Sequence, residues 1–145
     1  MNDAMELQPL PVDVRVRALL AANDLPTDDL DDPSIQLFGA LDGQRLAGVV
    51  GLQILGRTGL LRSLAVDPAF RDRGLGSRLC DLVVEQARAR ALESLWLLTT
   101  TARDYFARRG FGVAPRDEVP PQIRGTAQFS SLCPTSATMM RRRLG

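Results

Sequence analysis

A strand-like run, a glycine-containing loop and a long amphipathic segment follow one another between residues 59 and 91. Residues 59–66 are mostly apolar and stop at Asp67-Pro68, which predicts a buried strand. Residues 75–91 repeat apolar side chains at the i, i+3, i+4 spacing of a helix, and residues 95–99 form a second apolar run. Two strands joined by a crossover helix run parallel in one sheet. The segment therefore predicts a βαβ unit.

Further periodic segments surround this unit. Turn signals at Asp42-Gly43 and Gly56 separate the strand-like runs that precede it, which predicts an antiparallel meander. The other expected elements are a helix at 13–23 capped by Asp13, strands at 35–41 and 46–55, a helix at 102–109 and a strand at 137–142. We therefore expect an α/β (mixed α+β) fold: one mixed sheet with an antiparallel meander, a parallel βαβ unit and helices on both faces. The acidic residues after the first helix are expected to form a solvated turn; they are Asp28, Asp29, Asp31 and Asp32.

Composition limits the class of protein. A chain of 145 residues suits one domain, here residues 1–145, with one core. The net charge of +1 and the aromatic fraction of 5% argue against a nucleic acid or an anionic membrane as the partner. No apolar stretch approaches the ~20 residues of a membrane span, and the first residues lack the basic and apolar regions of a signal peptide. We expect a cytoplasmic protein that does not bind membranes.

Side chains that bind metals are scarce. The sequence contains no His and no Lys, so all 18 basic residues are Arg. The two cysteines, Cys80 and Cys133, are far apart and form no CxxC pair. We therefore expect no metal site and no disulfide framework, with both thiols reduced.

The loop Arg71-Asp72-Arg73-Gly74-Leu75-Gly76 lies where the predicted strand runs into the predicted helix. The first N–H groups of a helix have no intrahelical partner, and together with the helix dipole they favour an anion. Gly74 and Gly76 let a phosphate approach the backbone, and the two Arg side chains add charged donors. These features predict a pyrophosphate site. A dinucleotide fingerprint needs a third glycine and a P-loop needs a Lys, so neither fits, while a strand-to-helix turn without a ligand stays open.

Three segments in this order resemble the GNAT superfamily of N-acetyltransferases. They are Leu64-Ala65-Val66-Asp67-Pro68, the Arg71 to Gly76 loop with its [Q/R]-x-x-G-x-[G/A] signature, and the stretch from Ala102 to Gly110-Phe111. The order of elements matches as well, over nearly the whole chain. The resemblance implies the GNAT fold, acetyl-coenzyme A as co-substrate and a small-molecule amine as acceptor.

The resemblance also implies which residues hold acetyl-coenzyme A. Backbone groups of Leu64 and Val66 would pair with the pantetheine arm in the manner of an added strand. The pyrophosphate would be held by the N–H groups of Arg71, Asp72, Arg73, Gly74, Leu75, Gly76 and Ser77. The two parallel strands would splay so that the thioester lies between them. A backbone N–H near Val66 would stabilise the oxyanion that forms when the amine attacks.

The catalytic side chains are less clearly marked. Many family members carry a Tyr four residues before the Gly of the Gly-Phe pair, where it protonates the leaving thiolate; this chain has Phe106 there and Tyr105 one residue earlier. One residue turns a helix by ~100°, so Tyr105 is expected to point elsewhere. It stays a candidate acid, with a half-exposed amphipathic side chain as the alternative. Ser63, and Glu118 with its neighbour Asp117 in the tail loop, complete the catalytic candidates, against a solvated loop or a base acting through water.

Three residues are candidates for binding the acceptor. Arg62 suits a substrate carboxylate, Gln53 on the neighbouring strand suits substrate orientation, and Cys133 suits trivalent arsenic or, alternatively, buried packing. Arsenic enters because the tail, with Arg116-x-Glu118-x-Pro120 and then Phe129 to Met140, resembles a GNAT subgroup associated with bacterial arsenic-resistance operons. That resemblance implies detoxification of a small amine, such as an amino acid carrying arsenic or phosphorus.

A second class of function stays open. A domain that kept the fold and lost the chemistry would act as an acyl-coenzyme A sensor or regulatory module. Phe106, Thr99 in place of a common Asn, and a central strand without a carboxylate favour this alternative. Tight binding of acetyl-coenzyme A without turnover would distinguish it from an enzyme. A monomer and a homodimer are both compatible with the resemblance.

Overall fold

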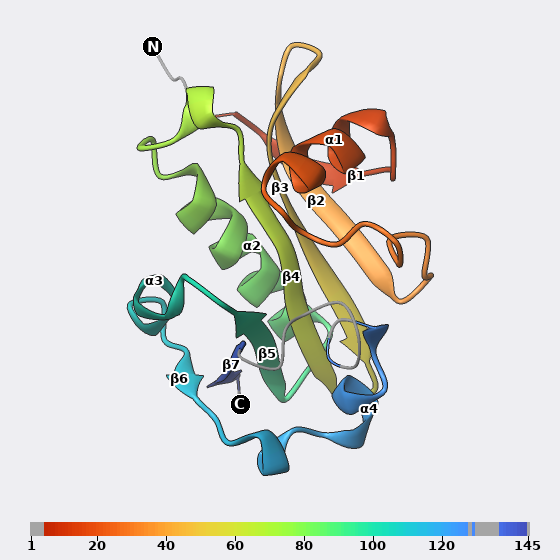
Figure 1. Cartoon of the computed structure of the whole chain (residues 1–145), viewed down its shortest axis with the longest axis vertical. Helices are drawn as coiled ribbons and strands as arrows, with labels where there is room; N and C mark the ends of the chain where they lie inside the picture. The colour runs from red at the N-terminus through yellow and green to blue at the C-terminus, as the bar shows by residue number, and fades with distance from the viewer. Residues whose placement is uncertain (1–4, 128, 130–136, 145) are drawn as a thin grey trace.

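A computed structural model of the chain describes residues 5–127, 129 and 137–144. In these residues seven strands form one mixed sheet in the order β1-β2-β3-β4-β5-β7-β6 (Figure 1). The strands are β1 (Leu7–Leu10), β2 (Ile35–Asp42), β3 (Arg45–Leu55), β4 (Thr58–Val66), β5 (Ser94–Thr99), β6 (Gly112–Val113) and β7 (Thr138–Arg143). The helices are α1 (Val14–Ala22), α2 (Leu75–Ala89), α3 (Arg103–Ala107) and α4 (Pro121–Arg124), with single turns η1 (Pro68–Phe70) and η2 (Arg116–Glu118).

The predicted meander is confirmed. β2, β3 and β4 pair antiparallel, and Asp42 opposite Arg45 and Leu55 opposite Thr58 close two tight hairpins. Gly43 and Gly56 take left-handed backbone angles there, with φ of 63° and 62°. A two-residue hairpin loop needs positive φ, which glycine adopts without strain.

The parallel pair of the predicted βαβ unit is β4 and β5, and it is short. Only the start of each strand pairs, with Thr58, Gly59 and Leu60 opposite Ser94, Leu95 and Trp96. β4 continues to Val66 and β5 continues to Thr99, but the two strands no longer pair with one another. The strands therefore diverge toward their carboxyl ends, as the resemblance implied.

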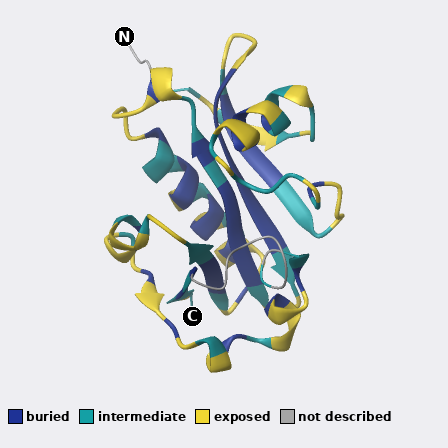
Figure 2. Cartoon of the chain, viewed as in Figure 1, coloured by how far each residue is buried: buried dark blue, intermediate teal, exposed yellow. Residues whose placement is uncertain are grey.

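Helices cover both faces of the sheet, as predicted. α2 buries Leu79, Val83 and Ala87 against one face, because these side chains recur on one side of the helix. α1 buries Val16 and Leu20 against the other face, where the side chains of alternate sheet residues point. Figure 2 shows β3 and β4 as buried along most of their length, so the core lies on either side of these two strands.

Several short elements were not predicted. β1 contains Pro9 and is a four-residue edge strand, where proline is tolerated because one side of the strand makes no ladder. β6 has two residues and α4 has four, so neither offers a period to detect. α2 ends at Ala89, two residues before the predicted end, and Ala91 has a left-handed φ of 58°.

Candidate active site

A cleft of ≈ 560 Å³ opens where β4 and β5 diverge. It is lined by residues 61–66 of β4, residues 97–102 in and after β5, residues 23–26 after α1, and by Gly76, Tyr105, Phe106 and Ala137. Leu64, Val66 and Gly76, which the resemblance assigns to the pantetheine arm and the pyrophosphate, all line this one cleft. The cleft thus lies where the two strands no longer pair.

The loop before α2 presents free backbone N–H groups. The first α-helical hydrogen bond there runs from Arg78 N to Gly74 O at 3.1 Å, so the N–H groups of residues 75–77 lie before the helical ladder begins. Gly74 has a left-handed φ of 74°, and a Cβ atom built on it would meet nothing within 4 Å. A phosphate can therefore approach this backbone, and the dipole of a 15-residue helix favours its charge.

The two Arg side chains of the loop are already in contact with protein. Arg71 donates through Nε to Val66 O at 3.2 Å and through Nη2 to Asn23 Oδ1 at 3.0 Å. Arg73 lies over the Phe70 ring, 5.5 Å from its centroid. Arg71 thus ties the loop to the end of β4 and to the end of α1, a role that the sequence did not indicate.

A β-bulge at Ser63 interrupts β4 inside the cleft. Val49 pairs with Ala65 and Gly51 pairs with Arg62, so β4 carries one extra residue over this stretch. Ser63 takes a left-handed φ of 59°, which is strained for a residue with a Cβ and costs about 1 kcal/mol or more. Bulges occur next to functional sites because they redirect a side chain. The Ser63 hydroxyl lines the cleft wall and accepts a hydrogen bond from Arg62 Nε at 3.2 Å.

Arg62 is fully buried and ion-paired, which corrects two expectations. Its Nη1 and Nη2 groups donate to the two carboxylate oxygens of Asp29, each at 2.5 Å. The exposed fraction of the side chain is 0% for Arg62 and 14% for Asp29. The acidic turn is therefore not simply solvated, since Asp29 reaches the sheet. The Arg62 guanidinium also does not lie free to receive a substrate carboxylate.

Gln53 belongs to the same buried network. Its Oε1 accepts from Arg62 Nη1 at 3.2 Å, and its Nε2 donates to Ser34 Oγ at 3.1 Å. Gln53 is 3% exposed and is absent from the residues that line the cleft. The structure therefore places Gln53 behind Arg62, where it supports Arg62 rather than facing a ligand.

Tyr105 lies in the cleft wall, contrary to the expectation that it points elsewhere. A Cβ atom on Gly76 would come within 3.0 Å of the Tyr105 hydroxyl, which shows how closely this hydroxyl approaches the start of α2. The Tyr105 ring meets Phe106 edge to face at 5.2 Å, and the Arg109 guanidinium lies over it at 4.7 Å. α3 is only five residues long, so Tyr105 and Phe106 both reach the cleft despite the ~100° between them.

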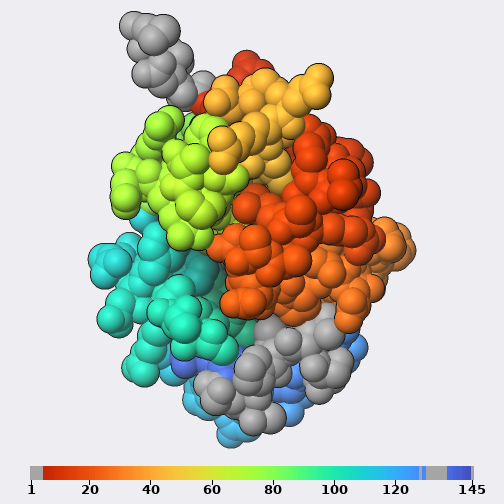
Figure 3. Space-filling model, turned by 45° about the horizontal axis from the view of Figure 1, so that its top comes forward, coloured from red at the N-terminus to blue at the C-terminus, as the bar shows by residue number. Residues whose placement is uncertain are grey.

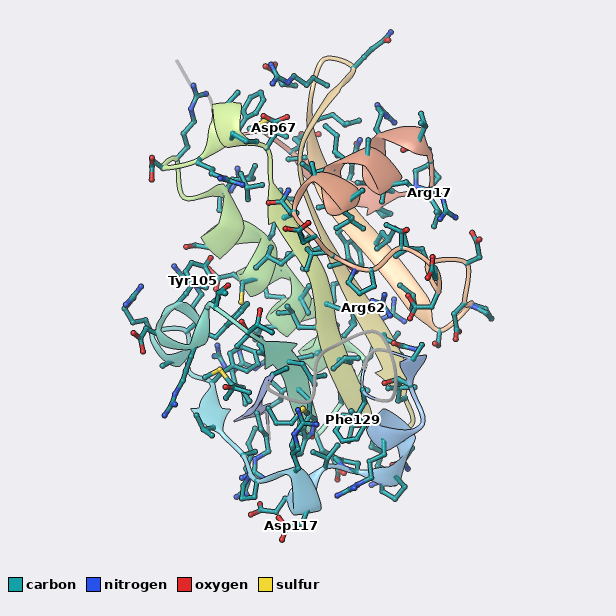
Figure 4. All side chains as sticks on the ribbon, viewed as in Figure 1. Arg17, Arg62, Asp67, Tyr105, Asp117 and Phe129 are labelled. Carbon is teal, nitrogen blue, oxygen red and sulfur yellow. The ribbon has the colours of Figure 1, made fainter. Side chains whose placement is uncertain are left out.

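Glu118 does not reach the cleft. It accepts a hydrogen bond from Arg141 Nη1 at 3.0 Å in an ion pair on the η2 turn, and the residues lining the cleft do not include it. Figure 4 shows its neighbour Asp117 at the lower end of the molecule, away from Arg62 and Tyr105. The prediction that Glu118 acts as the base is not supported by this placement.

Cys80 lies outside the site. Cys80 is buried in the core, and burial together with the charge of Asp81 raises the pKa of its thiol to about 11. Cys133, predicted to contact substrate, lies outside the described residues. Among the described residues, no group of three or more His, Cys, Asp or Glu side chains is arranged to hold a metal ion.

The residues that sequence reasoning missed are Asn23, Asp24, Leu25 and Pro26, which follow α1 and form one wall of the cleft. The sequence showed a helix end and a proline here, which marks a turn but not its position in the fold. The packing of α1 on β3 and β4 brings this turn over the cleft, and no local sequence pattern shows that packing.

Residues 6–111 match the model of the acetyltransferase (GNAT) family. The chain belongs to the GNAT family. The predicted fold and the predicted assignment to acetyltransferases are thereby confirmed. The GNAT fold is also that of solved structures: a GNAT-family acetyltransferase from Staphylococcus aureus Mu50 superposes with a TM-score of 0.80 over 98% of this chain and 100% of that one, at 17% identity.

Curated relatives of this GNAT chain are named amino-acid acetyltransferase. The protein from Neisseria meningitidis serogroup A is 39% identical over 66 residues, which are 46% of this chain and 15% of the relative. The chain therefore spans about 15% of the length of the relatives that it matches. N-acetylglutamate synthase from Neisseria gonorrhoeae, solved with coenzyme A and N-acetyl-glutamate, superposes with a TM-score of 0.81 at 22% identity. The superposition covers 100% of this chain and 36% of the synthase chain.

No helix among the described residues of this GNAT chain has the length and apolar character needed to cross a membrane.

Proposed function

We propose that the chain transfers the acetyl group of acetyl-coenzyme A to the amino group of a free amino acid. The single observation that carries the proposal is the cleft between diverging β4 and β5, which runs to the glycine loop at the start of α2. Membership of the GNAT family supports acetyl-coenzyme A as the donor. The name of the curated relatives, amino-acid acetyltransferase, supports an amino acid as the acceptor.

Acetyl-coenzyme A would lie along the exposed edge of β4. Leu64 and Val66 lie in the part of β4 that β5 does not pair, so their backbone groups facing the gap can bond the pantetheine amides, apart from the Val66 oxygen, which accepts from Arg71. The free N–H groups of residues 75–77 and the backbone around Gly74 would hold the pyrophosphate. The thioester would then lie near the bulge at Ser63, between the two strands.

Acetyl transfer needs one nucleophilic attack and one proton for the leaving sulfur. The neutral amine attacks the thioester carbonyl, the C–N bond forms, and the C–S bond breaks. A backbone N–H of β4 between the bulge at Ser63 and Val66 would stabilise the oxyanion. Tyr105 would give its hydroxyl proton to the departing thiolate, because among the described residues no group accepts a hydrogen bond from this hydroxyl and it lines the cleft.

A narrower proposal concerns the identity of the amino acid. The tail pattern between residues 116 and 140 resembles a subgroup associated with arsenic-resistance operons. It supports an acceptor that carries arsenic or phosphorus on an amino-acid frame. The screen described below therefore includes phosphinothricin as the phosphorus analogue alongside the common amino acids.

Calorimetric titration with acetyl-coenzyme A tests the donor site. Gly74→Glu places a carboxylate where the phosphates would bind, so binding is expected to disappear. Gly43→Glu is the matched control, because Gly43 is also left-handed with nothing within 4 Å of its Cβ position but lies in the β2–β3 hairpin. It should bind acetyl-coenzyme A like the wild type.

A thermal-shift assay gives a second measurement of the same binding. A ligand that binds only the folded state adds about 2.7 kcal/mol of stability at ~100 times its Kd, so acetyl-coenzyme A should stabilise the wild type by this amount. Equal binding by wild type and Gly74→Glu would contradict the placement of the pyrophosphate.

Release of free thiol from acetyl-coenzyme A then tests the reaction. Thiol should appear only with the accepted amino acid present. The alternative function, a non-catalytic acyl-coenzyme A sensor, is favoured by the position of Glu118 outside the cleft and by the lack of a carboxylate on β4. Binding of acetyl-coenzyme A without thiol release across the whole amine screen would establish that alternative.

A further inference from the structure

The connection between α1 and β2 forms a wall of the cleft, and none of its residues has a role in the reaction proposed above. Asn23, Asp24, Leu25 and Pro26 line the cleft on this side. Figure 3 shows the connection, in red-orange, on the same face of the molecule as the teal segment that follows β5. Both segments line the cleft, so a ligand between them touches both.

Two side-chain anchors hold this wall. Asn23 Oδ1 accepts from Arg71 Nη2 at 3.0 Å, which joins the start of the wall to the glycine loop. Asp29 pairs with buried Arg62, which joins the following residues to β4. Between the anchors, Thr27 O accepts from Arg17 Nη1 at 3.1 Å. The position of Asp24 is therefore set relative to both the loop and the strand that flank the cleft.

The backbone of Asp24 is also fixed. Asp24 N donates to Ala21 O at 3.1 Å and Leu25 N donates to Leu20 O at 2.9 Å, which closes the end of α1. Asp24 takes a left-handed φ of 58° at this point. Among the described residues, its carboxylate enters no ion pair and no hydrogen bond. The backbone of Asp24 is thus fixed at the cleft, and its exposed carboxylate keeps its acceptor oxygens free.

The charge of the cleft points to the ligand. Among the described residues that line the cleft, only Asp24 and Arg62 carry a formal charge. The charge of Arg62 is neutralised by Asp29 at 2.5 Å. Among the described lining residues, the Asp24 carboxylate is therefore the charge without an ion-pair partner, with the Arg71 guanidinium on the neighbouring Asn23 at the edge of the cleft. The complement of this carboxylate is a cation. We propose that Asp24 binds the protonated amino group of the acceptor, an inference that rests on the proposed function.

Asp24 acts before the bond-forming step. The bound ammonium group loses one proton to water, and the resulting amine attacks the thioester carbonyl as described above. The amide product carries no positive charge on its nitrogen. Asp24 therefore stabilises the bound acceptor but not the acetylated product, which favours release of the product.

The test compares Asp24→Asn with Asp28→Asn. Asparagine fits the left-handed region and has the same shape as aspartate, so the wall should keep its conformation. Asp28 lies on the same connection, is exposed and does not line the cleft. Its variant therefore makes the same change of charge outside the cleft. With the best acceptor from the amino-acid screen, Asp24→Asn should raise the acceptor KM about tenfold, as expected for one charge pair near a surface. The KM for acetyl-coenzyme A should stay unchanged, and Asp28→Asn should behave like wild type.

Calorimetry separates binding of the ammonium from a structural role of Asp24. On protein loaded with coenzyme A, Asp24→Asn should weaken binding of that amino acid about tenfold and leave binding of its N-acetylated product unchanged. Equal acceptor KM values for Asp24→Asn and wild type would overturn the proposal. It would also be overturned if Asp24→Asn weakened binding of the amino acid and binding of the N-acetylated product equally. If wild type acetylates no amino acid, the proposed function fails, and butylamine then serves as the calorimetric probe. Binding by wild type that is lost in Asp24→Asn supports the ammonium site, whereas equal binding or none overturns it.

Discussion

Replacing Asp29 by Ala removes the carboxylate that neutralises a buried guanidinium. Arg62 is 0% exposed and donates to both Asp29 oxygens at 2.5 Å, and its other partners, Gln53 and Ser63, are neutral. Removing one partner of a buried ion pair costs about 3–5 kcal/mol because the other charge stays in the interior. The Asp29 side chain is 14% exposed, so water can reach the place that it leaves. We therefore expect a loss of about 3 kcal/mol, at the lower end of that range.

Urea unfolding followed by circular dichroism measures this loss. About 3 kcal/mol is a large share of the ~5–15 kcal/mol typical of a domain, and it lowers Tm by roughly 10 °C at this size. The control is Asp31→Ala, which removes an ion pair from the same connection, where the side chains of Arg17 and Asp31 are 42% and 78% exposed. Exposed pairs contribute little, so its midpoint should hardly move. The double variant Asp29→Ala with Arg62→Met should recover part of the loss, since no buried charge is left. If Asp29→Ala is no less stable than Asp31→Ala, the reasoning about the buried pair is refuted.

Two further predictions concern the acid and the first helix. Tyr105→Phe should lower kcat about tenfold without changing the KM of the acceptor. This effect is smaller than a general acid usually gives, because a thiolate is already a fair leaving group. An unchanged kcat in steady-state assays would remove Tyr105 from the mechanism. Asp13→Ala should cost about 1 kcal/mol at pH 7, because Asp13 caps α1 by accepting from Val16 N at 3.0 Å. The Arg15 side chain, and then the Val16 N–H, lower the pKa of Asp13 below its ordinary 3.8. This contribution is therefore full above pH 3.8 and fades as pH falls through the lowered pKa, so the urea midpoints of variant and wild type should converge at low pH.

The parts of the fold that follow from local pattern were predicted well. β2, β3, β4 and α2 each span at least two periods of their apolar pattern, and tight turns at glycine separate the strands. β1 and α4 were missed because four residues show no clear period, and Pro9 and Pro121 read as breakers. Local pattern therefore identified the elements that bury the core and overlooked those at its margin.

The candidate site divides in the same way. The proposed donor-binding stretch, from Leu64 to Ser77, is continuous in the sequence, so a strand, a loop and a helix in order were enough to propose it. The rest of the cleft and its supporting contacts are assembled from distant segments. Asp29 and Arg62 are 33 residues apart, and nothing in the pattern around either residue indicates the other. Tyr105 was judged by helical rotation alone, but α3 is short and lies so close to α2 that rotation does not remove it from the cleft.

The short pairing between β4 and β5 has a consequence for how such a domain can change over time. Three residue pairs between β4 and β5 join the two halves of the sheet, and beyond these pairs the two backbones are separated by the gap. Neither strand depends on the other for its remaining hydrogen bonds, because β4 pairs with β3 and β5 pairs with β7. A side chain in the walls can therefore be replaced without a change in the pairing of the sheet. The choice of acceptor is thereby separated from the stability of the fold. If the proposed sites hold, a new specificity would require replacement of a few residues after α1 and β5, while the strands and the loop proposed to hold the donor stay as they are.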